Sequence, residues 1–101
     1  MRLKGKVAIV TGGAQGFGEG IVRTYVREGA KVAILDIKQA DAEALAKELG
    51  AGVMAIRCDV ASLGEVKAAV AAVADAMGRI DIVVNNAGWT YPNKPVLETT
   101  E

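Results

Sequence analysis

The chain contains no histidine, and its only cysteine is Cys58. We predict no zinc or haem site, because such sites draw on several imidazole or thiolate ligands and Cys58 is the one residue of either kind. A single cysteine also cannot form a disulfide within the chain, which is typical of proteins from a reducing compartment. We therefore expect a cytoplasmic protein in which Cys58 is a small apolar residue of the core rather than a nucleophile.

The sequence also has few aromatic residues, no net charge and no long apolar run. Aromatic residues make up 4%, and twelve basic residues balance twelve acidic ones. We therefore expect neither a nucleic-acid surface nor a polybasic membrane patch. The longest strictly apolar run, 68–74, is much shorter than the roughly 20 residues that span a bilayer. What remains is a globular composition, with 51% hydrophobic residues and 12 glycines in 101 residues, enough for one domain at most.

Short apolar runs alternate with amphipathic segments along the sequence. We predict strands at 6–11, 31–36, 52–57 and 80–84, helices at 16–28, 40–49 and 62–77, and the start of another helix at 96–101. In the third helix, Ser62 and Glu65 form a capping box and Gly78 marks the end.

This alternation predicts a doubly wound α/β fold of the Rossmann type. Right-handed crossovers would join the four strands into a truncated parallel sheet of order 3-2-1-4 with flanking helices. In such a sheet, ligands bind at the carboxyl ends of the strands, where strand 1 lies beside strand 4. The fourth strand would form an open edge through which copies of the chain associate.

The turn after the first strand contains Gly12, Gly16 and Gly18 in the pattern GxxxGxG. Glycine permits positive φ and lets the backbone come close to a pyrophosphate. The helix that follows would direct its N–H groups and positive dipole end at the same place. The pattern is also compatible with a turn that only lets the helix pack closely on the strand.

Asp36 ends the second strand, 18 residues after Gly18. A carboxylate at this position accepts hydrogen bonds from the adenosine ribose hydroxyls in Rossmann sites. It would repel the 2′-phosphate of NADP by roughly 4 kcal/mol at 4 Å and an effective dielectric constant of 20. The sequence therefore favours NAD over NADP, although Lys38 could weaken this preference. Asp36 could also cap the helix that follows, and the two roles do not exclude each other.

Thr-Gly-Gly-Ala-Gln-Gly-Phe-Gly at 11–18, together with Asn-Asn-Ala-Gly at 85–88, resembles the short-chain dehydrogenase/reductase family. The resemblance extends over essentially the whole chain and is strongest to 3-oxoacyl-carrier-protein reductases and sugar or polyol dehydrogenases. It implies that residues 1–101 are the N-terminal portion of an NAD(P)-binding Rossmann domain in a longer oxidoreductase. The complete enzyme would transfer hydride between the nicotinamide and a small alcohol or carbonyl substrate, as a homo-oligomer.

The resemblance also implies cofactor contacts for individual residues. These are Gly12, Gln15, Gly16, Phe17 and Gly18 around the pyrophosphate, Asp36 and Ile37 at the ribose and adenine, Asp59 and Val60 at the adenine, and Asn86, Ala87 and Gly88 beside the ribose. Gln15 stands where NADP-preferring relatives often carry a basic residue. Asn85 or Asn86 would also tie the fourth strand to its neighbours, and this structural role is an equal alternative to cofactor contact. Trp89 and Tyr91 would line the substrate pocket or cover the sheet edge.

The catalytic residues of the family are absent. Its tyrosine is followed four residues later by a lysine, whereas here Tyr25 is followed by Gly29 and Tyr91 by Pro95. The family also uses a serine to polarise the substrate carbonyl, but the only serine here, Ser62, is the predicted helix cap. We therefore predict no catalytic residue and no activity in this chain alone.

Three interpretations of the whole chain remain. It is part of an NAD-dependent oxidoreductase, a stand-alone nucleotide-binding module without redox activity, or part of an S-adenosylmethionine methyltransferase. The methyltransferase shares the glycine turn and the acid after the second strand, but it does not explain residues 85–88. We favour the oxidoreductase.

Overall fold

The computed structural model describes residues 2–12, 14, 16–85 and 96–99. Its elements follow one another as β1 (Val7–Thr11), α1 (Gly16–Arg27), β2 (Lys31–Asp36), α2 (Gln39–Leu49), β3 (Val53–Arg57), α3 (Leu63–Met77), β4 (Ile82–Asn85) and β5 (Val96–Thr99). The four predicted strands and three predicted helices are confirmed, with shifts of one or two residues at their ends. No helix among the described residues is both long and apolar enough to cross a membrane.

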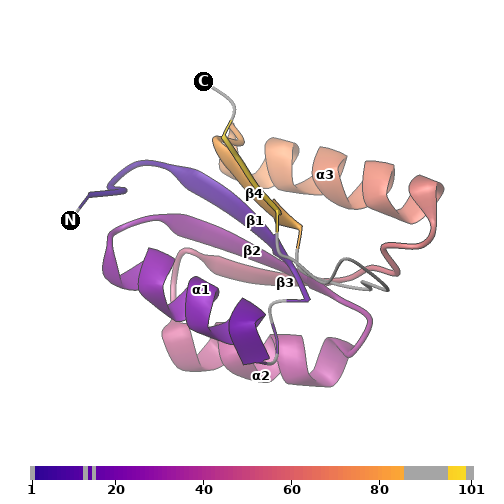
Figure 1. Cartoon of the computed structure of the whole chain (residues 1–101), viewed down its shortest axis with the longest axis horizontal. Helices are drawn as coiled ribbons and strands as arrows, with labels where there is room; N and C mark the ends of the chain where they lie inside the picture. The colour runs from indigo at the N-terminus through magenta and orange to yellow at the C-terminus, as the bar shows by residue number, and fades with distance from the viewer. Residues whose placement is uncertain (1, 13, 15, 86–95, 100–101) are drawn as a thin grey trace.

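The strands form one sheet of order β3-β2-β1-β4-β5. β1 to β4 are parallel, as the pairing of Val10 with Ile34 on one side and with Val84 on the other illustrates. Helices α1 and α2 cover one face of the sheet and α3 covers the other (Figure 1). This three-layer arrangement confirms the predicted doubly wound Rossmann-type fold and the order 3-2-1-4.

The core has two halves, one on each face of the sheet. On the first face, Ala8 and Val10 of β1 pack in a cluster with Val22 of α1. On the second face, Val7 and Ile9 belong to a cluster with residues of α3. All five residues of β1 are buried, because both faces of the strand are covered. This double burial explains why the parallel strands read as continuous apolar runs in the sequence.

Cys58 belongs to the cluster under α3, where it is 1% exposed. The prediction of a buried apolar role is therefore confirmed. Burial is the main reason that the pKa of its thiol is raised, and the neighbouring carboxylates of Glu65 and Asp59 act in the same direction. The thiol stays protonated at neutral pH, which makes it a poor nucleophile.

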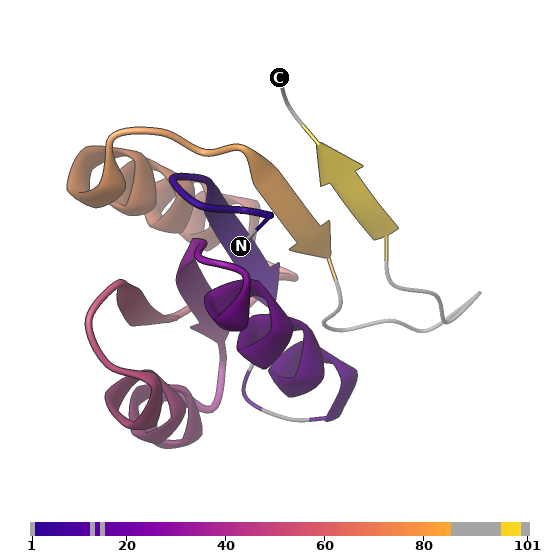
Figure 2. The ribbon, with the colours of Figure 1, turned by 90° about the vertical axis from the view of Figure 1, so that its left-hand side faces the viewer.

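The predicted helix start at 96–101 is wrong. Val96–Thr99 is a strand that pairs antiparallel with β4, with Ile82 opposite Thr99 and Asn85 opposite Val96 (Figure 2). The expectation of an open edge at β4 is therefore also wrong, because a fifth, antiparallel strand covers it. An uncovered β4 would present a row of backbone donors and acceptors, and pairing with β5 satisfies the groups on that side. β-Branched residues at both ends of the segment suit an extended conformation.

The predicted capping box at α3 is only half formed. The Ser62 hydroxyl accepts a hydrogen bond from the Glu65 N–H at 3.3 Å, as predicted. The Ser62 N–H donates to the Asp59 carbonyl at 2.9 Å. The Glu65 carboxylate accepts from the Asp59 N–H instead, at 3.0 Å. At the other end, Gly78 closes the helix with φ of 83°, in the left-handed region.

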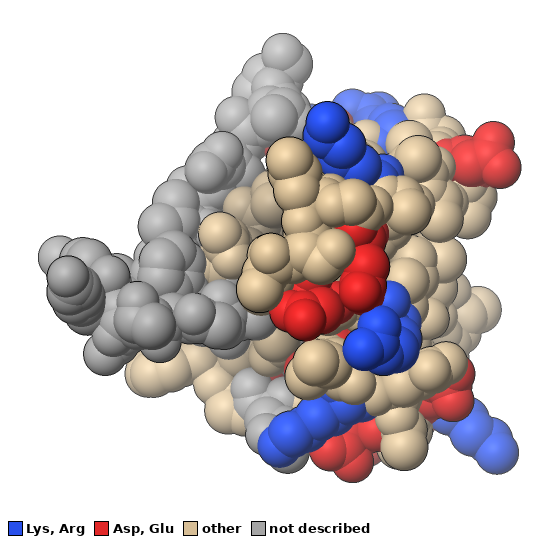
Figure 3. Space-filling model, turned by 90° about the vertical axis from the view of Figure 1, so that its right-hand side faces the viewer, with Lys and Arg blue, Asp and Glu red and all other residues tan. Residues whose placement is uncertain are grey.

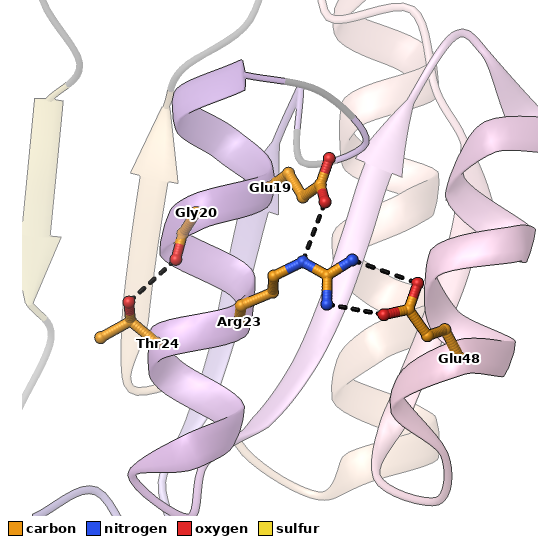
Figure 4. Close-up of polar contacts among 5 residues, drawn as sticks. All are labelled: Glu19, Gly20, Arg23, Thr24 and Glu48. Atoms are coloured by element: carbon orange, nitrogen blue, oxygen red, sulfur yellow. Dashed lines mark hydrogen bonds and ion pairs between the residues drawn. The ribbon is translucent and has the colours of Figure 1, made fainter.

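An ion pair joins α1 to α2 on the surface of the first face. The Arg23 guanidinium donates to both carboxylate oxygens of Glu48, at 2.7 and 3.1 Å, and its Nε donates to Glu19 at 2.8 Å (Figure 4). The partners raise the pKa of Arg23, and Arg23 lowers the pKa of Glu48. These side chains are all partly exposed, so water screens the interaction and its contribution to stability is small.

A buried carboxylate fastens the start of β1 to the segment before β4. The Val7 N–H donates to Asp81 Oδ2 at 2.9 Å, and the Asp81 N–H donates to the Val7 carbonyl at 2.8 Å. The other carboxylate oxygen, Oδ1, accepts from Arg79. Hydrogen bonds from Arg79 and from the Val7 backbone lower the pKa of Asp81 below its ordinary value of 3.8. The bond at Val7 starts the β1–β4 pairing that brings the two strand ends together.

Asp81→Asn should flatten the dependence of stability on pH in acid. Because the folded-state pKa of Asp81 is lowered, its contribution is fully present above the unfolded pKa and is lost as pH falls through the folded pKa. Chemical denaturation should be measured at neutral pH and at a pH below the ordinary pKa of aspartate. Between these two conditions, Asp81→Asn should lose less free energy of unfolding than the unchanged chain. Equal losses in the two proteins would contradict a role of Asp81 in acid unfolding.

Candidate functional site

The carboxyl ends of β1 to β4 lie along one edge of the molecule, the right-hand side in Figure 1. In a space-filling view of that side, acidic groups lie near the middle with basic groups around them (Figure 3). The sequence-predicted residues that the structure describes follow the ends of these strands. They are Gly12, Gly16, Phe17 and Gly18 after β1, Asp36 and Ile37 at β2, and Asp59 and Val60 after β3. Gln15, Asn86, Ala87 and Gly88 lie outside the described residues.

The turn after β1 has the conformation for which glycine is suited. Gly12 and Gly16 have φ of 66° and 57°. The Gly12 N–H donates to the Leu35 carbonyl at 2.7 Å, which fastens the turn to β2. A Cβ built on Gly16 would meet no atom within 4 Å, so packing within the described chain does not demand glycine there. The reason for glycine at this position is therefore its backbone conformation, with φ in the left-handed region.

Helix α1 begins at Gly16 and points its N-terminal end into this turn. The first four N–H groups of a helix have no partner within the helix, and they carry its positive dipole end. Gly18 is buried, whereas the side chain of Phe17 is 79% exposed. The turn and the helix end together can hold an anion such as a pyrophosphate.

Asp36 links two loops at the end of β2. Its side chain is buried, with Oδ2 accepting from the Ala14 N–H at 3.1 Å and Oδ1 accepting from the Lys38 N–H at 2.9 Å. The alternative role as a helix cap is wrong, because Lys38 occupies the N-cap position of α2 and makes no side-chain capping bond. A carboxylate has about four lone-pair positions, so two backbone bonds leave capacity for two hydroxyl donors.

The segment after β3 is held by hydrogen bonds on several sides. The Cys58 N–H donates to the Asp36 carbonyl at 3.2 Å, which joins this segment to β2. Asp59 Oδ1 accepts from the Ala61 N–H at 2.9 Å. Glu65 Oε1 accepts from the Asp59 N–H at 3.0 Å and from Arg57 at 2.9 Å. Sequence reasoning assigned Glu65 to the helix cap and therefore missed this contact.

At the end of β4, the side chain of Asn85 meets that of Thr11. The Thr11 hydroxyl lies 3.1 Å from Asn85 Oδ1 and 3.3 Å from the Val84 carbonyl, and it can donate its proton to either. This contact ties β1 to β4 at the point where the winding of the sheet reverses, so the structural role that was predicted for an asparagine here is confirmed for Asn85. Trp89 and Tyr91 lie outside the described residues.

A hollow of about 720 Å³ lies along α1, on the side next to β4, and it shares Gly16 and Phe17 with the turn after β1. It is lined by Gly16, Phe17, Gly20, Ile21, Thr24, Tyr25 and Val84. Its surface is mostly apolar, and burial raises the pKa of Tyr25. This lining offers no cluster of charged groups, so it differs from the polar strand-end site and does not resemble a phosphate site.

Comparison with protein families and curated proteins gives a consistent result. The model of the short chain dehydrogenase family matches residues 6–101. The chain is 53% identical over 88 residues to the sex determination protein tasselseed-2 of Zea mays, covering 86% of this chain and 26% of that protein. It is 45% identical over 100 residues to a sorbitol dehydrogenase of Cereibacter sphaeroides, covering 99% of this chain and 39% of that enzyme. The chain thus spans well under half the length of these relatives.

A solved structure shares the fold. It is the 3-ketoacyl-(acyl-carrier-protein) reductase from Brucella melitensis in complex with NADH. The TM-score is 0.79 at 42% sequence identity, and the match covers 80% of this chain and 33% of the reductase chain.

Proposed function

The chain belongs to the short-chain dehydrogenase family, and on that premise we propose that it is the NAD(H)-binding, N-terminal portion of a longer oxidoreductase domain. The complete, homo-oligomeric enzyme would transfer hydride between the nicotinamide and a small alcohol or carbonyl substrate. The observation that carries the proposal is the buried Asp36 carboxylate, which is hydrogen-bonded to the glycine turn at Ala14. This bond brings the predicted ribose acceptor and the predicted pyrophosphate turn together at one place.

The described residues fit a dinucleotide. The first turn of α1 would offer its N–H groups to the pyrophosphate, and the positive-φ glycines before it would let the phosphates come close to the backbone. Asp36 keeps acceptor capacity for two ribose hydroxyls. Ile37, which is 54% exposed, would offer an apolar surface to the adenine, and Asp59 and Val60 would contact the same base. Gln15 would complete the phosphate turn, and Asn86, Ala87 and Gly88 would border the ribose on the β4 side.

The preference for NAD over NADP follows from the charge of Asp36. Its buried carboxylate would lie where a 2′-phosphate has to be accommodated. Two unit charges about 4 Å apart repel by roughly 4 kcal/mol at an effective dielectric constant of 20. Lys38 follows two residues later, and its backbone N–H donates to Asp36 Oδ1 at 2.9 Å. This arrangement supports NAD as the preferred cofactor.

When bound, NAD supplies the hydride acceptor, and this chain supplies binding and orientation. The backbone of the turn would fix the pyrophosphate, and Asp36 would fix the adenosine half. Thr11 and Asn85 hold β1 against β4, so that the two sides of the site keep their spacing. Neither tyrosine in the sequence has a lysine four residues later, so no residue of this chain is assigned to proton transfer.

The purified chain should therefore produce no NADH from alcohols, although it binds the cofactor. The reason is the absent tyrosine–lysine pair, which the family uses for acid–base catalysis. Absorbance of NADH, followed over a panel of sugar alcohols and secondary alcohols, should remain at background. Turnover that disappears in a Gly18→Trp variant would contradict this prediction.

Titration calorimetry with matched ligands tests the class of cofactor. We expect NAD to bind and S-adenosylmethionine, which shares the adenosine but has no pyrophosphate, to bind at least about tenfold more weakly, a difference of about 1.4 kcal/mol. Binding of ADP-ribose close to that of NAD would show that the adenosine and pyrophosphate contacts dominate. Tighter binding of S-adenosylmethionine would refute the proposed cofactor.

A further inference from the structure

Glu65 is a helix-start glutamate whose side chain serves a different purpose from capping. In a complete capping box its carboxylate would accept from the Ser62 N–H. Here the Ser62 N–H donates to the Asp59 carbonyl, and Glu65 Oε1 accepts from the Asp59 N–H at 3.0 Å. The same oxygen accepts from Arg57 Nη1 at 2.9 Å. The carboxylate therefore fastens the segment between β3 and α3 rather than the first turn of α3.

The result is that Asp59 is held at three of its polar groups. Its N–H is bound by Glu65, its carbonyl by the Ser62 N–H, and its Oδ1 by the Ala61 N–H. Oδ2 is then the carboxylate oxygen that would meet an amino group on a ligand. A bond to an ionised acceptor is roughly twice as strong as a neutral one, so the bond to Glu65 contributes strongly to this placement.

We propose that Glu65 is a positioning residue for base recognition, which fixes Asp59 so that its carboxylate accepts a hydrogen bond from the 6-amino group of adenine. The inference rests on the proposed function, in which Asp59 and Val60 receive the adenine. A carboxylate fixed in place favours an amino group and disfavours a 6-oxo group, because two acceptors would then face one another. If Asp59 could move, it would turn away from the 6-oxo group and the discrimination would fall.

The proposal is tested by the affinity for NAD divided by the affinity for its hypoxanthine analogue, called the ratio below. The two ligands differ only at the base, so a general loss of folding lowers both affinities and leaves their ratio unchanged. We expect Glu65→Ala to lower the ratio about fivefold or more, since one hydrogen bond to a charged group is at stake. Glu65→Gln keeps an acceptor for the Asp59 N–H and should keep most of the ratio.

Ser62→Ala is the matched control. It removes the bond between the Ser62 hydroxyl and the Glu65 N–H at the same helix start but leaves the Glu65 carboxylate in place. It should destabilise the chain and leave the ratio unchanged. Glu65→Asp is a second variant that keeps the acidic charge of the first turn, which favours folding. Its carboxylate is shorter by one methylene, so the ratio should fall here as well.

Asp59→Ala separates failure of this inference from failure of the proposed function. If Asp59→Ala lowers the ratio and both Glu65→Ala and Glu65→Asp leave it unchanged, Asp59 recognises the base without help from Glu65 and the inference is wrong. If Asp59→Ala also leaves the ratio unchanged, the assignment of Asp59 to the adenine is wrong. The inference is supported if Asp59→Ala, Glu65→Ala and Glu65→Asp each lower the ratio and Ser62→Ala leaves it unchanged.

Discussion

Asp36→Ala should change the ratio of NAD affinity to NADP affinity by about a hundredfold or more in favour of NADP, equivalent to roughly 3 kcal/mol. Two effects act in the same direction. The variant loses the acceptor for the ribose hydroxyls, which weakens NAD. It also loses the negative charge that repels the 2′-phosphate, which strengthens NADP relative to NAD.

The measurement is titration calorimetry with both cofactors at fixed ionic strength, because salt screens the charge on an exposed phosphate. Asp36→Asn retains the size of the side chain and separates the charge from the packing. Asp41→Ala, in the first turn of α2, is the matched control, since it removes one exposed carboxylate from a nearby position. An unchanged ratio in Asp36→Ala would show that Lys38 or another group governs the choice of cofactor.

Gly16→Ala should lower the affinity for NAD about tenfold or more, which corresponds to roughly 1.4 kcal/mol. Gly16 has φ of 57°, and a Cβ there would enter space that no described protein atom occupies within 4 Å. If that space receives the pyrophosphate, the added methyl group keeps the phosphate away from the backbone N–H groups. The strained conformation should also cost roughly 1 to 2 kcal/mol of stability.

Gly78→Ala provides the matched control for the strain. Gly78 also has positive φ, 83°, and also has no atom within 4 Å of a Cβ, but it lies at the C-terminal end of α3. Both variants should lose similar stability in denaturant titrations, and only Gly16→Ala should lose affinity. Equal affinities in the two variants would contradict a pyrophosphate site at the glycine turn.

Most of the fold could be predicted because its determinants are local or periodic. β1 is an apolar run followed by Gly12, and β2 is an apolar run that ends in Asp36; both faces of these strands are covered in the structure. Helix α3 shows an apolar period and a serine cap, and Gly78 ends it where predicted. The strand order follows from right-handed crossovers between parallel strands.

The errors arose where a distant partner decides the outcome. Residues 96–99 are compatible with a helix start or with a strand, and pairing with the edge of β4 favours the extended conformation of β5. Glu65 has the spacing of a capping box, but Arg57 and the Asp59 N–H compete for its carboxylate. The bond between Arg23 and Glu48 joins residues 25 apart in the sequence, and no local pattern indicates it.

The places of the candidate site residues in the fold could be predicted from the sequence, but the hydrogen bonds between them could not. Gly12, Gly16 and Asp36 stand at strand ends, so topology alone brings them to one edge of the sheet. The bond from the Ala14 N–H to Asp36 depends on the exact path of the turn, which the residue types do not specify. The same is true of the contact between Thr11 and Asn85.

The most direct test of the central claim is an NMR titration of the ¹⁵N-labelled chain with NAD. The proposed site predicts that the largest amide shift changes fall on Gly16–Gly18, on Asp36–Ile37 and on Asp59–Val60. Amides at the opposite edge, such as those of Gly29 and Gly52, should change little. Absence of any change at saturating NAD, or changes confined to the apolar hollow around Thr24 and Tyr25, would contradict the assignment of the strand ends as the cofactor site.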